Sequence, residues 1–178
     1  MSVRIMSTAV AIFVSAVANP VFAQHPAMPA GMTHEEHVRQ MQKDADLKQR
    51  GDAAMGFDQR KTTHHFRLTA EGGAIEVEAN DPADGASREQ IRGHLRAIAA
   101  AFADGNFDAP VATHDEVPTG VSALQRLKAV VTYSFEEAPS GARVRIRTSN
   151  REARQAIHEF LRYQIREHRT GDPLTIGT

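Results

Sequence analysis

The chain has 178 residues and a formal net charge of −1 at pH 7, with no cysteine and no tryptophan. This near-neutral charge argues against a nucleic-acid-binding protein, which is expected to carry a basic excess. The lack of cysteine excludes disulfides, thiol nucleophiles, cysteine-ligated zinc and iron–sulfur clusters.

The first 23 residues are typical of a secretory signal peptide. Arg4 gives a positive start, the stretch from Ile5 to Ala18 is mostly apolar, and small residues precede an expected cleavage after Ala23. The apolar stretch is shorter than the roughly 20 residues that a membrane-spanning helix needs. We therefore expect a periplasmic or secreted protein beginning at Gln24, with no membrane anchor after cleavage.

Residues 24–60 are expected to form a leader rich in histidine and methionine. Thr33 and Glu36 have the spacing of a capping box, which predicts the start of a short polar helix. The helix is expected to run to about Arg50 and to stop at Gly51. Its apolar face is narrow, so we expect it to pack weakly or to dock on a protein partner.

An α+β domain is expected over residues 61–178. Apolar and polar residues alternate over 63–70 and 75–79, which predicts a hairpin with its turn at Gly72 and Gly73. A capping box beginning at Ser87 predicts the next helix, whose buried stripe carries Ile91, Leu95, Ile98 and Phe102.

The same order recurs further along the chain. A short helix over 121–128 leads to strands around 131–135 and 144–146, and a capping box at Ser149 predicts the last helix. Two successive ββα units therefore predict a four-stranded antiparallel sheet with both helices on one face, preceded by the short N-terminal helix.

Four phrases of the chain resemble those of a family of small exported bacterial proteins. They are Met55–Asp58, Thr62–Phe66, Gly105–Pro110, and Ala156–Leu161 continuing to Glu167–Asp172. The resemblance covers most of the chain after residue 55. It is consistent with export and implies no particular activity.

The leader offers the strongest candidate for a binding site. On a helix, His34, His37 and Met41 share one face, and Met32 lies just before them. Imidazole and thioether ligands together favour copper over zinc. We therefore predict a non-catalytic copper-binding protein with these four residues as ligands. The two histidines are one residue too close together for the H-E-x-x-H motif of zinc proteases.

His64 and His65 are candidates for additional ligands from the folded domain. Consecutive strand residues point to opposite faces, so only a distorted strand would aim both at one ion. In a regular strand His64 shares the buried side of Phe66 and His65 shares the exposed side of Arg67. A structural role for one and solvation of the other is the simpler interpretation.

The sequence is compatible with two other functions. In the first, the protein is an interaction module that binds a partner through its leader helix, and its histidines are structural. It is also compatible with a small enzyme that uses His114 and Asp115 in a loop, or His94 and His158 on the two helices. The chain contains no nucleophile-elbow, P-loop or dinucleotide-binding motif.

Three arginines on one strand, Arg143, Arg145 and Arg147, could hold an anion. Glu76 and Glu78 lie at matching positions on the other hairpin. Cross-strand charge pairing on a solvated face explains both sets and is the interpretation we favour.

Overall fold

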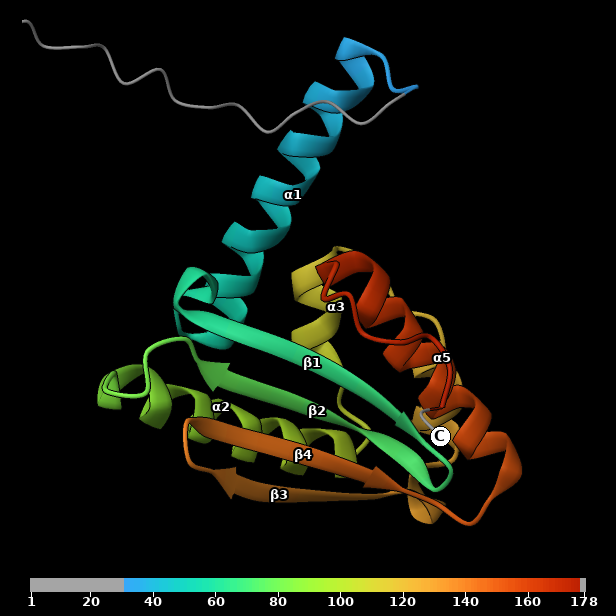
Figure 1. Cartoon of the computed structure of the whole chain (residues 1–178). Coiled ribbons are helices and arrows are strands. Elements are labelled where there is room, and N and C mark those ends of the chain that lie inside the picture. The colour runs from blue at the N-terminus through green and yellow to red at the C-terminus, as the bar shows by residue number, and fades with distance from the viewer. Residues whose placement is uncertain (1–30, 177–178) are drawn as a thin grey trace, which may run out of the picture.

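The computed structural model describes residues 31–176. The expected signal peptide and its cleavage site lie outside this range. The described part contains five α-helices, two short 3-10 helices and four strands (Figure 1). In chain order they are α1 (His34–Met55), η1 (Gln59–Lys61), β1 (Thr62–Thr69), β2 (Gly72–Ala79), α2 (Gly85–Ala103), α3 (Asp108–His114), α4 (Val121–Arg126), η2 (Lys128–Val130), β3 (Thr132–Ala138), β4 (Gly141–Arg147) and α5 (Arg151–His168).

The four strands form one antiparallel sheet in the order β1-β2-β4-β3, as the repeated ββα pattern predicted. The two hairpins meet where β2 pairs with β4. Helix α2 packs mainly on β3 and β4, whereas α5 packs on β1 and β2. Helix α2 of the first ββα unit therefore covers the hairpin of the second unit, and α5 of the second unit covers the hairpin of the first. This exchange joins the two units into one core.

The core lies between the sheet and these two helices. Phe102 and Phe107 stack with ring centroids 4.2 Å apart, and Phe160 meets both rings edge-on. The predicted stripe of α2 is buried throughout. Apolar burial of this kind is the main stabilising contribution to a domain of this size.

Helix α1 is longer than the sequence suggested. Thr33 and Glu36 form the expected capping box, but the helix continues through Gly51 to Met55 and is followed by Gly56, which has a φ of 73°. A glycine with positive φ just past the last helical residue is the usual stop signal. Gly51 lies inside the helix, where an added Cβ would meet only the ends of the flexible Gln59 and Met55 side chains. This glycine therefore does not end the helix.

The first hairpin turns at Ala70 and Glu71, two residues earlier than predicted, because the two glycines belong to β2. A Cβ on Gly73 would lie 2.4 Å from the carbonyl oxygen of Arg67 and 2.2 Å from Leu161 of α5. Glycine therefore allows the helix to approach the sheet closely here.

The two predicted helix caps in the domain are displaced. Asp84 caps α2 by accepting from the backbone of Ser87, and Asn150 rather than Ser149 caps α5. The segment that carries His114 was expected to be a loop and is the helix α3.

None of the helices within residues 31–176 has the length and apolar character needed to cross a membrane.

Candidate functional site

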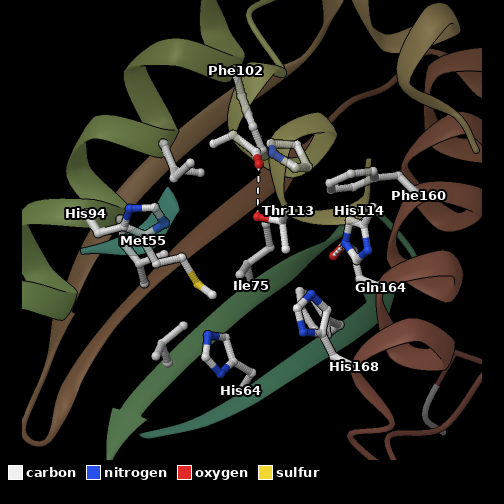
Figure 2. Close-up of a pocket in the computed structure, with 16 residues that line it drawn as sticks. Met55, His64, Ile75, His94, Phe102, Thr113, His114, Phe160, Gln164 and His168 are labelled. Atoms are coloured by element: carbon white, nitrogen blue, oxygen red, sulfur yellow. Dashed lines mark hydrogen bonds between the residues drawn. The ribbon is translucent and has the colours of Figure 1, made fainter. Parts of the chain in front are cut away.

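A cavity of about 70 Å³ lies between the inner face of the sheet and the helices. Four of the nine histidines line it, together with the thioether of Met55 (Figure 2). We call it the histidine cavity. Its lining residues are Met55, His64, Phe66, Ile75, Val77, His94, Leu95, Ile98, Phe102, Ala109, Pro110, Thr113, His114, Phe160, Gln164 and His168.

The polar side chains of the cavity come from five different elements. His64 is on β1 and points inward beside Phe66, and His94 is on α2. Met55, His114 and His168 are the last residues of α1, α3 and α5. The carboxyl ends of three helices therefore meet at the cavity, and such ends carry partial negative charge.

Three of the four histidine rings form a row in which His168 contacts both His64 and His114. The rings of His64 and His168 stack with centroids 5.9 Å apart and an interplanar angle of 10°. His168 meets the ring of His114 edge-on at 5.1 Å. The ring of His94 instead makes an edge contact with the ring of Phe57, with centroids 5.6 Å apart. Packing against neighbouring rings thus fixes most of these imidazoles.

Hydrogen bonding in the cavity is incomplete. His114 Nε2 lies 3.0 Å from Gln164 Oε1. His64 Nε2, His114 Nδ1 and Gln164 Nε2 are buried and have no hydrogen-bond partner among the described residues. Buried polar atoms are nearly always paired, so three unpaired atoms in one cavity call for an explanation.

Burial keeps these imidazoles neutral. It lowers the pKa of His64 to about 4, with smaller contributions from His94 and His65. It lowers the pKa of His168 to about 3, again assisted by neighbouring histidines. Burial also lowers the pKa values of His94 and His114. Neutral imidazole is the form that binds metal ions.

No group of three or more His, Cys, Asp or Glu side chains within residues 31–176 is arranged to hold a metal ion as it stands. The ring separations of 5.1 and 5.9 Å are nonetheless suitable. A metal–nitrogen bond of about 2.0–2.1 Å, extended by a ring radius of roughly 1.2 Å, places two bound imidazole centroids roughly 5–6.5 Å apart. The ring centroids therefore already have a suitable spacing, but the rings would have to rotate before their nitrogen atoms could bind one ion.

The residues predicted as ligands in the leader lie at a distance from this cavity. His34 and Met41 are exposed and His37 is half-buried on the amino-terminal half of α1, which projects from the domain (Figure 1). Met32 precedes that helix. From Met41 to Met55 the helix axis spans about 21 Å at about 1.5 Å per residue. The structure thus brings His64 to the cavity but not the leader residues.

Helix α1 is held to the domain from about its midpoint onward. Arg50 Nε donates to the carbonyl oxygen of Thr113 at 3.0 Å, and Asp44 pairs with Arg169 at 2.6 Å. Leu47 is buried, whereas Val38 and Met41 of the predicted apolar face are exposed. The contacts that dock this helix therefore do not depend on a metal ion.

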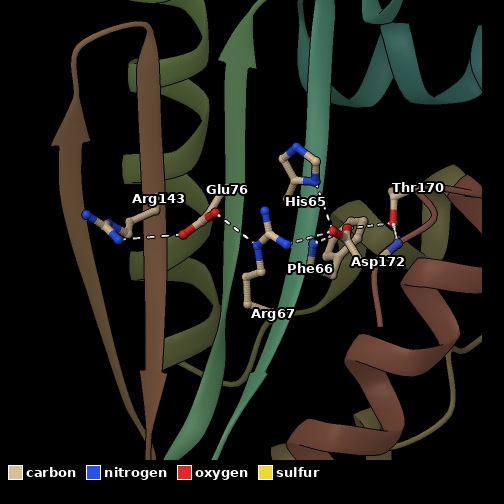
Figure 3. A network of polar contacts seen from close by, with 7 residues as sticks. All are labelled: His65, Phe66, Arg67, Glu76, Arg143, Thr170 and Asp172. Carbon is tan, nitrogen blue, oxygen red and sulfur yellow. Dashed lines mark hydrogen bonds and ion pairs between the residues drawn. The ribbon is translucent and has the colours of Figure 1, made fainter. Parts of the chain in front are cut away.

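His65 points away from the cavity, as the alternation of a regular strand predicts. Its Nδ1 lies 2.9 Å from Asp172, a buried carboxylate that also accepts from the backbone N–H of Phe66 and from Arg67 (Figure 3). Burial opposes ionisation of Asp172, but hydrogen bonds from Thr170, Phe66 and His65 outweigh it and lower its pKa. Asp172 thus fastens the carboxyl-terminal segment to the edge strand β1.

The outer face of the sheet carries a ladder of ion pairs that continues from this point. Glu76 bridges Arg67 and Arg143 at 3.4 and 3.5 Å, and Glu136 lies 3.0 and 2.9 Å from Arg143 and Arg145. Arg147 pairs with Glu71 at 3.5 Å. Cross-strand pairing, the interpretation favoured from the sequence, therefore accounts for the three arginines of β4.

The histidine pairs considered for an enzyme are not formed. His158 Nε2 lies 3.0 Å from the carbonyl oxygens of Thr69 and Gly72, where it ties α5 to the first turn, and only His94 lines the cavity. His114 is paired with Gln164, whereas Asp115 is exposed and occupies the left-handed cap position of α3. Neither proposed partner orients its histidine.

Fold and cavity together define an α+β domain in which one buried and three half-buried histidines line a single cavity. Comparison with protein-family models, with curated proteins and with solved structures finds no match to this chain.

The sequence did not predict that three of the cavity histidines, His94, His114 and His168, would lie together. His94 lies next to Leu95 of the buried stripe, and His168 follows the buried Ile165 by three residues, so helical periodicity carried a signal for both. His114 gave none, because its helix was not predicted.

Proposed function

We propose that this protein binds one soft metal ion, copper(I), in the histidine cavity. The observation that carries the proposal is the pair of buried, unpartnered imidazole nitrogens, His64 Nε2 and His114 Nδ1, on either side of His168. An ion that binds these lone pairs would remove the cost of leaving them buried and unsatisfied.

The chemistry of the cavity supports a soft ion of low charge. Imidazole nitrogen and the Met55 thioether are ligands suited to copper(I). Apart from Thr113 and Gln164 the remaining walls are apolar, and placing an ion in such surroundings becomes rapidly more costly as its charge increases. A monovalent ion is therefore favoured over a divalent one, and the partial negative charge of three helix ends favours a cation over an anion.

A second hollow adjoins the cavity. It has a volume of about 300 Å³, shares His64 and His168 with the cavity, and has Thr62, Thr63 and Thr170 among its other lining residues. The stacked pair of imidazoles therefore separates this polar hollow from the cavity. Rotation of these rings would bring an ion from solvent to the inner nitrogens.

With the export expected from the amino-terminal sequence, the proposal describes an extracytoplasmic copper-binding protein that acts without catalysing a reaction. The leader site of Met32, His34, His37 and Met41 remains a separate prediction. On this view it is a peripheral site, because it lies on the projecting half of α1.

An interaction module is the second candidate, and one observation favours it. Val38 and Met41 are 46% and 40% exposed on the projecting half of α1. An apolar pair on an otherwise polar helix suits docking on another protein. This function would use the leader helix and would leave the histidine cavity unchanged.

Metal retention after loading tests the proposal. The purified protein is incubated separately with Cu(I), Cu(II) and Zn(II), desalted, and analysed for bound metal. We expect about one copper per chain, lost in the double variant His64→Leu with His168→Leu and retained in the neighbouring variant His65→Ala. Both leucines suit an apolar cavity, and thermal unfolding checks that the variant remains folded.

The leader variant His34→Ala with His37→Ala separates the two metal sites. Retention of copper in this variant supports the histidine cavity. Loss of copper in it, with retention in the cavity variant, would place the ion in the leader. No ion held more tightly than micromolar would contradict metal binding altogether.

A further inference from the structure

The side chain of Gln164 contacts one of the two ring nitrogens of His114 and so determines which nitrogen is free to bind an ion. Gln164 is 4% exposed and lies on α5, and its Oε1 is 3.0 Å from His114 Nε2. An amide oxygen can only accept a hydrogen bond. In this arrangement the proton of the neutral ring is therefore on Nε2, and the lone pair is on Nδ1.

We infer that Gln164 is a positioning residue that fixes the tautomer of His114 and thereby makes Nδ1 its metal-binding atom. The inference rests on the proposed function for the role of Nδ1, but the tautomer itself is a property of the metal-free protein. His114 Nδ1 is buried without a partner, which is consistent with an atom kept free for a ligand.

The arrangement follows a common feature of metal sites. A histidine that binds a metal through one ring nitrogen usually donates its other N–H to a carboxylate, a carbonyl or water. Gln164 supplies such an oxygen. Gln164 is itself buried on α5.

The local electrostatics suit this role. Burial lowers the pKa of His114, whereas the hydrogen bond that His114 donates to Gln164 and the charges of Glu167 and Glu116 act in the opposite direction. An uncharged amide holds the Nε2 proton in place without adding a negative charge that would strongly favour the imidazolium. The ring thus stays neutral and keeps its Nδ1 lone pair.

Nitrogen-15 NMR of the histidine rings in the metal-free protein tests the inference. We expect the His114 shifts to show a protonated Nε2 and an unprotonated Nδ1 at pH 7.5. The variant Gln164→Met, which has no such acceptor, should lose this preference. The variant Gln164→Glu keeps an acceptor oxygen, so Nε2 should stay protonated, and its negative charge should in addition raise the pKa of the ring. A proton on Nδ1 in the unmodified protein would overturn the inference without any variant.

Copper affinity gives the second measurement. Loss of an outer-shell partner typically weakens metal binding about 10–100-fold, which is the loss we expect for Gln164→Met and not for Gln164→Glu. Equal affinity in all three proteins would contradict the positioning role. The expected tautomer in a protein that retains no copper would contradict the proposed function alone, whereas retained copper with the opposite tautomer would contradict only the role of Gln164.

Discussion

The two faces of β1 illustrate two ways of burying histidine and charge. On the inner face, His64 lies in an apolar cavity with its Nε2 unpartnered and its pKa lowered by burial. On the outer face, the adjacent His65 contacts Asp172, and a ladder of arginines and carboxylates continues across the sheet. The outer arginines and carboxylates form ion pairs, although Arg143 Nε and Arg145 Nε lack a well-aligned hydrogen bond. The inner nitrogens His64 Nε2 and His114 Nδ1 have no polar partner among the described residues. Unsatisfied groups are more informative about function than paired ones.

The largest change in stability is expected when a packed side chain on the inner side of the sheet is removed. Phe160 is 2% exposed and contacts the rings of Phe102 and Phe107. Phe160→Ala should lower the free energy of unfolding by about 3–5 kcal/mol, because it removes buried area and leaves a cavity. Urea denaturation measures the change. A loss below about 1 kcal/mol would show that the core is not arranged as described.

The second prediction concerns pH. Burial holds the pKa values of His64 and His168 at about 4 and 3, below the ordinary value near 6.5 that applies to the unfolded chain. The unfolded state therefore binds more protons as the pH falls through 6.5. Stability should be full above pH 6.5 and should fall between pH 6.5 and about 4, by up to about 1.4 kcal/mol per pH unit for each histidine.

Urea midpoints at pH 7.5 and pH 5 measure this loss. The double variant His64→Leu with His168→Leu should lose much less stability over the same range. Asp172 does not interfere, because its lowered pKa gives stability that is present above about pH 3.8 and lost only below it. A pH dependence unchanged in the double variant would contradict neutral, buried histidines.

The third prediction concerns the fastening of the carboxyl-terminal segment. Asp172→Ala removes the acceptor for the backbone N–H of Phe66 and for Arg67. We expect a loss of about 2 kcal/mol, as for other hydrogen bonds to charged groups. Hydrogen exchange should show faster exchange at Phe66, where the edge strand becomes uncovered. Unchanged exchange at this amide would exclude the fastening role.

The smallest effect is expected within the outer ladder. Glu76→Gln removes one charge that bridges Arg67 and Arg143. Partly exposed pairs of this kind contribute at most about 1 kcal/mol, and the loss should shrink further in high salt. A loss comparable with that of Phe160→Ala would overturn the contrast between the two faces.

Periodicity accounts for what could be predicted of the fold. Alternation along 63–70 and the stripe of Ile91, Leu95, Ile98 and Phe102 depend on local geometry, so strands, helices and buried faces could be predicted. Turn and cap positions depend on tertiary contacts. Gly73 resembled a turn residue but serves the close approach of Leu161, and no local pattern distinguishes the two roles.

The site could be predicted only in part, because it is formed by residues far apart in the chain. His64 was assigned correctly to the buried face of its strand. Its meeting with His168 depends on α5 packing over β1, which sequence alone does not provide. The leader drew attention because its histidines and methionines are close in sequence, although proximity in sequence does not create a cavity.

Histidine-ring NMR during addition of one equivalent of Cu(I) to the metal-free protein tests the central claim most directly. We expect the ring resonances of His64, His114 and His168 to shift first, while those of His65 and His158 stay unchanged. A response confined to His34 and His37 of the leader, with the cavity histidines unaffected, would contradict it.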